Sequence, residues 1–182
     1  RVAISQTVAR PDFKETANAY FQDREFGAQV YGNPFLETSD IQNADIRWEW
    51  YYDESGEDSL SVAIFYKEFE NAIERVVIPA SGTAANARSF RNSDVADLAG
   101  LEVEGRFSFE PFDTNNSEFF VDFNAAYIES EVEIGNGQTR AMQGQPEYTA
   151  NLILGYDNFA TGQQLTLLIN QNGETIADAG LQ

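Results

Sequence analysis

Apolar and polar residues alternate one by one along most of this chain. The stretch ADIRWEWYY at residues 44–52 shows the pattern clearly, with Trp48 and Trp50 on one side and Arg47 and Glu49 on the other. Strict alternation predicts strands, and the helical period is almost absent. The apolar sets are Val2, Ile4 and Val8; Ile46, Trp48, Trp50 and Tyr52; Leu60, Val62, Ile64 and Tyr66; Leu101, Val103, Phe107 and Phe109; Phe119, Val121, Phe123 and Tyr127; Tyr148, Ala150, Leu152, Leu154 and Tyr156; Leu165, Leu167 and Ile169. We predict an all-β antiparallel meander of about seven strands, each long enough to supply the ~9–11 residues that a tilted membrane strand requires.

The connections between these strands alternate in length. Residues 54–58, 112–116 and 158–162 are short and carry the Gly, Asn, Asp and Ser of tight turns. Long connections are predicted at residues 11–42, 79–96 and 132–146, with another starting at Gln171. A bacterial outer-membrane barrel keeps its periplasmic turns short and its outer loops long. The pattern therefore predicts a fragment of a transmembrane β-barrel.

Aromatic residues gather at both ends of the predicted strands. Trp50, Tyr52, Phe107, Phe109, Phe112, Phe119, Tyr156 and Phe159 lie near the short turns, and Tyr66, Tyr127 and Tyr148 lie at the opposite ends. Two aromatic girdles around an aliphatic middle are typical of a lipid-facing wall. The alternative is that the rings form cross-strand pairs inside a soluble sandwich. We expect the tryptophan side to face lipid and the Arg47 and Glu49 side to face an aqueous lumen.

Composition narrows the function classes. The formal net charge of −19, with only 11 Lys and Arg, argues against nucleic acid as a partner. The absence of His and Cys excludes Ser-His-Asp and Cys-His catalysis, disulfides, and imidazole or thiolate zinc sites within this chain. The acidic turn at residues 53–59 lacks the order of a calcium loop. We expect no cofactor and no metal site.

Carboxylates are the remaining candidates for chemistry. Glu102, Glu104 and Asp122 could in principle face each other as a glycosidase pair. The alternation requires polar residues at these positions in any case, so we interpret them as lumen wall and not as an enzyme site. Arg47, Arg106 and Lys67 share the inward side and are expected to pair with the acids.

Six blocks of the sequence resemble the C-terminal barrel of TonB-dependent outer-membrane receptors, in the family's order. They are SQTVARPDF at 5–13, YGNPFLE at 31–37, DIRWEWY at 45–51, SVAIFYKEFENAIERV at 61–76, LAGLEVEGRF at 98–107 and MQGQPEYTANLILGYDN at 142–158. LLINQNGETI at 167–176 also resembles a family strand, with Thr175 where Arg is common. The resemblance implies a barrel of about 22 strands around a plug, with import driven through TonB. Residues 1–182 would then be a partial barrel domain, without the plug, TonB box or closing strand, and its two open sheet edges could pair with a second copy.

The first long connection is the most plausible ligand-contacting segment, because loops of this length are usually functional or disordered. It carries aromatic residues among charged ones, and the candidate ligand contacts are Tyr20, Phe21, Phe26 and Tyr31. The alternative is that these rings fold the loop onto itself or cap the barrel mouth.

Two functions remain open. The first is a receptor of the bacterial outer membrane that imports a large nutrient such as an iron chelate or an oligosaccharide, with lipid, the plug of the same receptor, TonB and the ligand as partners. The second is a soluble secreted β-sandwich that binds carbohydrate or calcium. The alternation of connection lengths favours the first.

Overall fold

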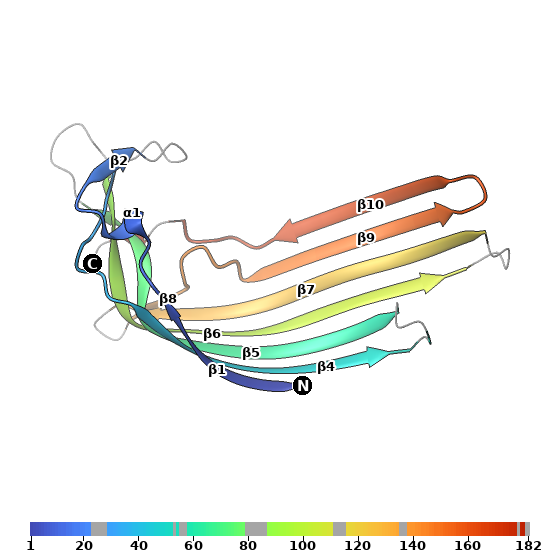
Figure 1. Cartoon of the computed structure of the whole chain (residues 1–182), viewed down its shortest axis with the longest axis horizontal. Coiled ribbons are helices and arrows are strands. Elements are labelled where there is room, and N and C mark those ends of the chain that lie inside the picture. Colours follow the sequence, from blue (N-terminus) through green and yellow to red (C-terminus); the bar gives the residue numbers. More distant parts are fainter. Residues whose placement is uncertain are drawn as a thin grey trace.

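The computed structural model describes residues 1–22, 29–52, 54, 58–78, 87–110, 116–134, 138–177 and 179–180. In this part of the chain seven long strands form one curved open sheet in the order β1-β4-β5-β6-β7-β9-β10, each antiparallel to the next (Figure 1). Their bounds are β1 Val2–Ala9, β4 Ser39–Tyr51, β5 Ser59–Ile78, β6 Ala87–Phe109, β7 Ser117–Glu133, β9 Tyr148–Asn158 and β10 Gln163–Asn172. The predicted all-β meander of about seven strands is confirmed.

Short elements fill the connections at one end of the sheet. They are α1 Phe13–Thr16, β2 Tyr20–Gln22, β3 Gln29–Tyr31, β8 Thr139–Arg140 and β11 Ala179–Gly180. The four-residue α1 starts with a capping box, in which Asp12 Oδ1 accepts from Phe13 N and Glu15 Oε2 accepts from Asp12 N. Within the described ranges, no helix has the length and apolarity needed to span a membrane.

The predicted long connection at residues 79–96 is wrong in extent. Residues 87–96 belong to β6, which stays paired with β5 from Ser59↔Arg106 to Ile78↔Ala87. Residues 39–42 of the predicted first loop likewise belong to β4. We name residues 67–78 of β5 and 87–98 of β6 the outer extension, because they continue beyond the Tyr66 level. In Figure 1 the far ends of β5 and β6 turn away from the plane of the long strands.

The side-chain alternation reverses inside the outer extension, and this reversal hid it from the sequence pattern. Asn71 has a positive φ of 57°, and Asn71 and Asp94 are both skipped in the β5–β6 pairing. As a result Ala72 packs in the same cluster as Phe69, three residues earlier, although a regular strand would place them on opposite faces. Both strands therefore change faces at one level while their register is kept.

One face of the sheet carries an uncharged band between the short turns and Tyr66, Tyr127 and Tyr148. On β7 the band runs from Phe119 to Tyr127, about 26 Å along the strand before tilt, close to the ~25 Å apolar belt of outer-membrane barrels. Among the described residues, every position on this outer face of the band is uncharged. Charges begin at its edge, where Glu129 is in register with Tyr66, and continue one level further with Glu68, Asp97 and Glu131.

The buried core lies outside this band, in the outer extension and its neighbours. Ala72, Ala96 and Val132 form a buried cluster against Phe69, Ile134 and Met142. The membrane-spanning part has both faces open, and Trp48 and Trp50 are 54% and 53% exposed. Such exposure of large apolar side chains marks a surface that meets lipid or a partner.

Candidate functional site

A row of polar side chains crosses the concave face of the sheet at one level. Cross-strand pairing places Glu49, Ser61, Glu104, Asn124, Asn151 and Asn170 side by side on β4, β5, β6, β7, β9 and β10. We call these six residues the polar row. Because neighbouring strands are antiparallel and these residues are directly opposite one another, the Cβ atoms of neighbours lie about 5 Å apart, within reach of side-chain hydrogen bonds.

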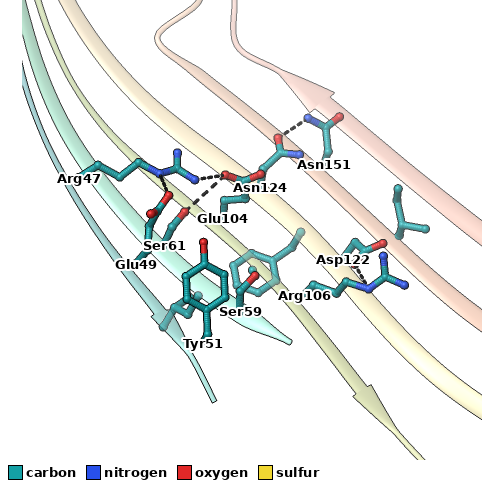
Figure 2. Close-up of a pocket in the computed structure, with 14 residues that line it drawn as sticks. Arg47, Glu49, Tyr51, Ser59, Ser61, Glu104, Arg106, Asp122, Asn124 and Asn151 are labelled. Carbon is teal, nitrogen blue, oxygen red and sulfur yellow. Dashed lines mark hydrogen bonds and ion pairs between the residues drawn. The ribbon is translucent and has the colours of Figure 1, made fainter. Parts of the chain in front are cut away.

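The first half of the polar row is charged. Arg47 Nε donates to Glu49 Oε1 over 2.7 Å, and Arg47 Nη2 donates to Glu104 Oε2 over 3.0 Å (Figure 2). Ser61 Oγ donates to the same Glu104 oxygen over 3.4 Å. The guanidinium therefore joins two carboxylates from strands that are not neighbours, as the fork of an arginine allows.

The second half of the polar row consists of amides. Asn151 Nδ2 donates to Asn124 Oδ1 over 2.7 Å, and Asn170 Nδ2 donates to Asn151 Oδ1. Asn172 Nδ2 adds a 3.4 Å bond to Asn170 Oδ1. Asn151 and Asn170 each donate one bond and accept another, so the series extends across three strands without a net charge.

The level nearer the short turns is also polar. Arg106 Nε lies 3.6 Å from Asp122 Oδ1, and its guanidinium carbon lies 5.4 Å from the centroid of the Phe120 ring. Phe120 in turn covers Gly155 on β9, where a Cβ would overlap the ring. Figure 2 shows Arg106 and Asp122 turned toward each other beside the polar row.

These side chains line hollows on the concave face. A hollow of about 320 Å³ is bordered by Arg47, Glu49, Glu104, Asp122 and Asn151. A second, of about 700 Å³, is bordered by Asn43, Asp45, Lys67 and Glu102. The expectation that Arg47 and Arg106 pair with acids on the inward side is confirmed; Lys67 lies on that side without an ion pair to any described residue.

Two of the three carboxylates considered as a glycosidase pair are engaged by neighbouring side chains. Glu104 is held by Arg47 and Ser61, and Asp122 lies against Arg106. Within the part of the chain that the structure describes, no three His, Cys, Asp or Glu side chains could hold a metal ion together. The arrangement is suited to a water-facing barrel wall, in which Arg47 and Arg106 balance carboxylates on neighbouring positions.

The opposite face carries the aromatic girdle at the short-turn end. Ring centroids follow each other at 6.4 Å from Trp48 to Trp50, 5.3 Å to Tyr52, 5.4 Å to Phe107 and 5.9 Å to Phe123. Phe119 continues the girdle, 5.7 Å from Phe109 and 4.6 Å from Tyr156. The rings are exposed or half-buried, and amphipathic rings of this kind favour the membrane–water boundary.

The ligand-contact candidates lie on the β2–β3 hairpin, apart from the polar row. Tyr20 and Tyr31 are cross-strand partners with ring centroids 5.9 Å apart, and Tyr20 is 68% exposed. Phe21 pairs with Val30, so its side chain is on the other side of the hairpin. Phe26 lies outside the described residues. Their role as ligand contacts stays a prediction.

The hairpin is fixed to β6 rather than hanging free. Gln29 and Val30 pair in parallel with Ala87 and Arg88, and Val30 is buried. Asn33 Nδ2 donates to Phe90 O over 2.9 Å. Gly32 lies against the backbone of Ala17, where a Cβ would overlap the carbonyl oxygen. The first long loop therefore folds onto the outer extension.

The asparagines of the polar row were missed by sequence reasoning. Each was seen as a polar position, but their juxtaposition depends on the register of β7, β9 and β10. A signal was present in the sequence: the three asparagines lie equally many residues from the short turns that join their strands. Residues at equal distances from a hairpin turn pair with each other, as Asn124 does with Asn151 and Asn151 with Asn170.

An antiparallel meander with an uncharged, aromatic-ringed outer face and an ion-paired concave face is the wall of a transmembrane β-barrel. Over residues 1–179 the sequence matches the family described as TonB dependent receptor-like, beta-barrel, and the chain belongs to this family. No curated protein gives a significant match. The family serves transport at the outer membrane, and its full-length members have a plug domain and interact with TonB.

Proposed function

We propose that this chain forms wall and outer loops of an active-transport receptor that imports a large nutrient, an iron chelate or an oligosaccharide, with energy delivered through TonB. The observation that carries the proposal is the contrast between the two faces of one sheet. The outer face is uncharged over the height of a bilayer, whereas the concave face at the same level holds Arg47, Glu104 and the amides of the polar row.

The polar row would line the aqueous space in which the plug sits and through which cargo moves. Its charges are half-exposed and balanced in pairs, so they offer hydrogen bonds at little electrostatic cost. We also propose that the chain has no enzymatic role, because Glu104 and Asp122 on the concave face are engaged by Arg47 and Arg106.

The exposed rings of the β2–β3 hairpin are proposed as an outer contact for the cargo. Tyr20 and Tyr31 present a tilted ring pair beside Gln29, whose Oε1 accepts from the Tyr31 hydroxyl over 3.3 Å. Phe21, whose side chain is on the other side of the hairpin, and Phe26, which lies outside the described residues, are proposed contacts from the sequence alone. Aromatic faces can stack on sugar rings or on planar chelators, so the pair is compatible with either cargo.

Growth and uptake would test the transport function. A strain that lacks the full-length receptor should lose uptake of one labelled cargo among a panel of iron chelates and oligosaccharides, and the wild-type gene should restore it. The Tyr20→Ala receptor should bind that cargo severalfold more weakly, whereas Phe159→Ala, an exposed ring at the opposite strand end, should not. Unimpaired uptake of the whole panel in the deletion strain would contradict the proposal.

A further inference from the structure

The sheet continues beyond the membrane boundary as a small unit of five strands. β3 pairs in parallel with the far end of β6, and β11 pairs in parallel with the far end of β5, so the order is β2-β3-β6-β5-β11. Paired residues lie on the same side of a sheet, so Gln29, Ala87 and Ile78 share one side. Ile78 follows Ala72 by an even number of residues on β5, and Ala72 lies on the concave side. The side that holds Gln29 therefore continues the concave face of the wall toward the mouth of the barrel.

Two accessible tyrosine rings lie on this mouth side of the β2–β3 hairpin. Tyr31 is two residues after Gln29, and Tyr20 is its cross-strand partner, so the three side chains share the mouth side. Tyr20 and Tyr31 are 68% and 38% exposed, and their ring planes are inclined by 46°. Gln22 pairs with Gln29 and adds a second amide beside the rings. We call Tyr20, Gln22, Gln29 and Tyr31 the mouth platform.

The mouth platform offers aromatic faces and primary amides, and none of its four side chains is charged. Gln29 Oε1 accepts from the Tyr31 hydroxyl over 3.3 Å, which leaves its Nε2 group to donate to a guest. Amides and hydroxyls both donate and accept, so an amide can exchange hydrogen bonds with neighbouring hydroxyls of one molecule. The C–H face of a pyranose is apolar and packs on an aromatic ring, while its hydroxyls point outward to the amides. The platform therefore matches the two kinds of surface that a sugar presents.

The charges of the chain favour a neutral guest over an anionic iron chelate. The formal net charge is −19, which repels anions as they approach. In the lumen wall Arg47 and Arg106 are paired with carboxylates already. Lys67 shares its hollow with Asp45 and Glu102. A chelate that carries carboxylate or catecholate charge would meet more acidic than basic side chains along this wall.

The amides of the polar row repeat the chemistry of the mouth platform further inside. Asn124, Asn151 and Asn170 form an uncharged, hydrogen-bonded series on the concave face. A hydroxyl-rich guest can exchange hydrogen bonds with these amides, whereas a chelate that turns its polar atoms inward to the metal would leave more of them unmatched. Two separate surfaces along the same face thus suit a neutral, hydroxyl-rich cargo.

We propose that the mouth platform binds an uncharged oligosaccharide, with Tyr20 and Tyr31 stacked on pyranose faces and Gln29 bonded to their hydroxyls. The assignment of this oligosaccharide to the transported cargo rests on the proposed function. The polar row then offers hydrogen bonds to the same molecule deeper in the lumen.

Calorimetric titration of the full-length receptor in lipid nanodiscs tests the cargo class. The probes are neutral hexasaccharides of glucose, mannose, xylose, arabinose and galactose in their common linkages, with ferric citrate and ferrichrome as an anionic and a neutral iron chelate. We expect saturable binding of at least one hexasaccharide and of neither chelate. Its affinity should be the same at low and high salt, because screening acts only on charged partners.

Variants of the platform locate the binding. Tyr20→Ala and Tyr31→Ala should each weaken the bound hexasaccharide about five- to tenfold, whereas Tyr20→Phe keeps the ring and should retain most of the affinity. Phe13→Ala removes an exposed ring of the same loop outside the hairpin and should leave the affinity unchanged.

Three outcomes separate this inference from the transport function. Failure of every hexasaccharide to bind, or equal affinity in wild type and both alanine variants, overturns the oligosaccharide site. Loss of iron-chelate uptake in the deletion strain would keep the transport function and overturn the oligosaccharide as its cargo. Tyrosine-dependent binding of a hexasaccharide, in a receptor whose deletion impairs no uptake, would keep the site and remove only its link to transport.

Discussion

The Glu74 carboxylate accepts a 2.7 Å hydrogen bond from Arg140 Nη2, and the pair joins two strands that the sheet separates. Glu74 is on β5 and Arg140 is on β8, with β6 and β7 between them. The change of faces at Asn71 places Glu74 on the side from which Arg140 reaches it. The side chains of Glu74 and Arg140 are 4% and 18% exposed, so the pair is largely desolvated.

Removing Arg140 should loosen the outer extension. In Arg140→Met the Glu74 carboxylate stays buried without its counter-charge, at a cost of about 3 kcal/mol. Hydrogen exchange of the residues 72–78 amides in the full-length receptor should accelerate about 100-fold. The double variant Glu74→Met/Arg140→Met should recover much of the protection, because two apolar side chains can replace a buried pair.

Arg47→Met, at a half-exposed pair, is the control and should change the free energy of unfolding by under about 1 kcal/mol. Equal effects of Arg140→Met and Arg47→Met would contradict this account of burial.

Two consecutive alanines of β7 test which face meets lipid. Ala125 pairs with Val103 and Ala150 on the outer face, and Ala126 pairs with Glu102 and Thr149 on the concave face. Ala125→Arg should destabilise the folded receptor by about 2 kcal/mol, since Arg on a lipid-facing barrel position costs roughly 2–4 kcal/mol at the midplane and less toward the boundary. Ala126→Arg gains Glu102 as a neighbour and should be nearly neutral. Denaturant titration after refolding into phospholipid vesicles measures both; the reverse order would place lipid on the polar face.

The Phe120 ring and Gly155 should behave as a coupled unit. Gly155→Val forces the ring off β9 and away from Arg106, with an expected cost of about 1–3 kcal/mol. Phe120→Ala should destabilise the receptor less than Gly155→Val does. In the Phe120→Ala background, Gly155→Val should cause no further loss of stability. A double-variant cycle by the same titration measures the coupling. Additive effects would show that the ring does not cover the glycine.

Asn92 should control the order of the first loop. Its Oδ1 accepts from Glu37 N over 2.9 Å, and its Nδ2 donates to Glu37 O over 3.0 Å and to Asn71 O over 2.8 Å. In Asn92→Ala these bonds are lost together, so the Glu37 amide should exchange at least about tenfold faster while amides of the uncharged band keep their protection. Asn151→Ala, which removes an amide from the polar row, is the matched control and should leave Glu37 unchanged. Unchanged exchange in Asn92→Ala would mean that another contact holds the loop.

The sequence was sufficient to predict which side chains lie on each face of the membrane-spanning sheet. It was insufficient to predict the structure of the outer extension. Period two assigned Trp48 and Arg47 to opposite faces because neighbours on a strand always differ in this way. It failed at Asn71, where a left-handed backbone angle breaks the period, and residues 87–96 of β6 were consequently interpreted as part of a loop. The Glu74–Arg140 pair spans 66 positions and depends on a bend, so no local pattern encodes it. The Asn124–Asn151 bond depends on register, which alternation restricts to one face but does not fix.

The simultaneous skip of Asn71 and Asp94 has a practical meaning for anyone who recombines receptors of this family. The two positions act as a matched joint: both must be inherited from one parent, or both replaced by strands that alternate without interruption. A hybrid that takes one of them alone would turn the far part of a single strand inside out, so that Ala72 and Glu74 of β5, or Ser93 of β6, leave the concave side. Crossover points for such hybrids therefore belong at the short turns, away from the level of the joint.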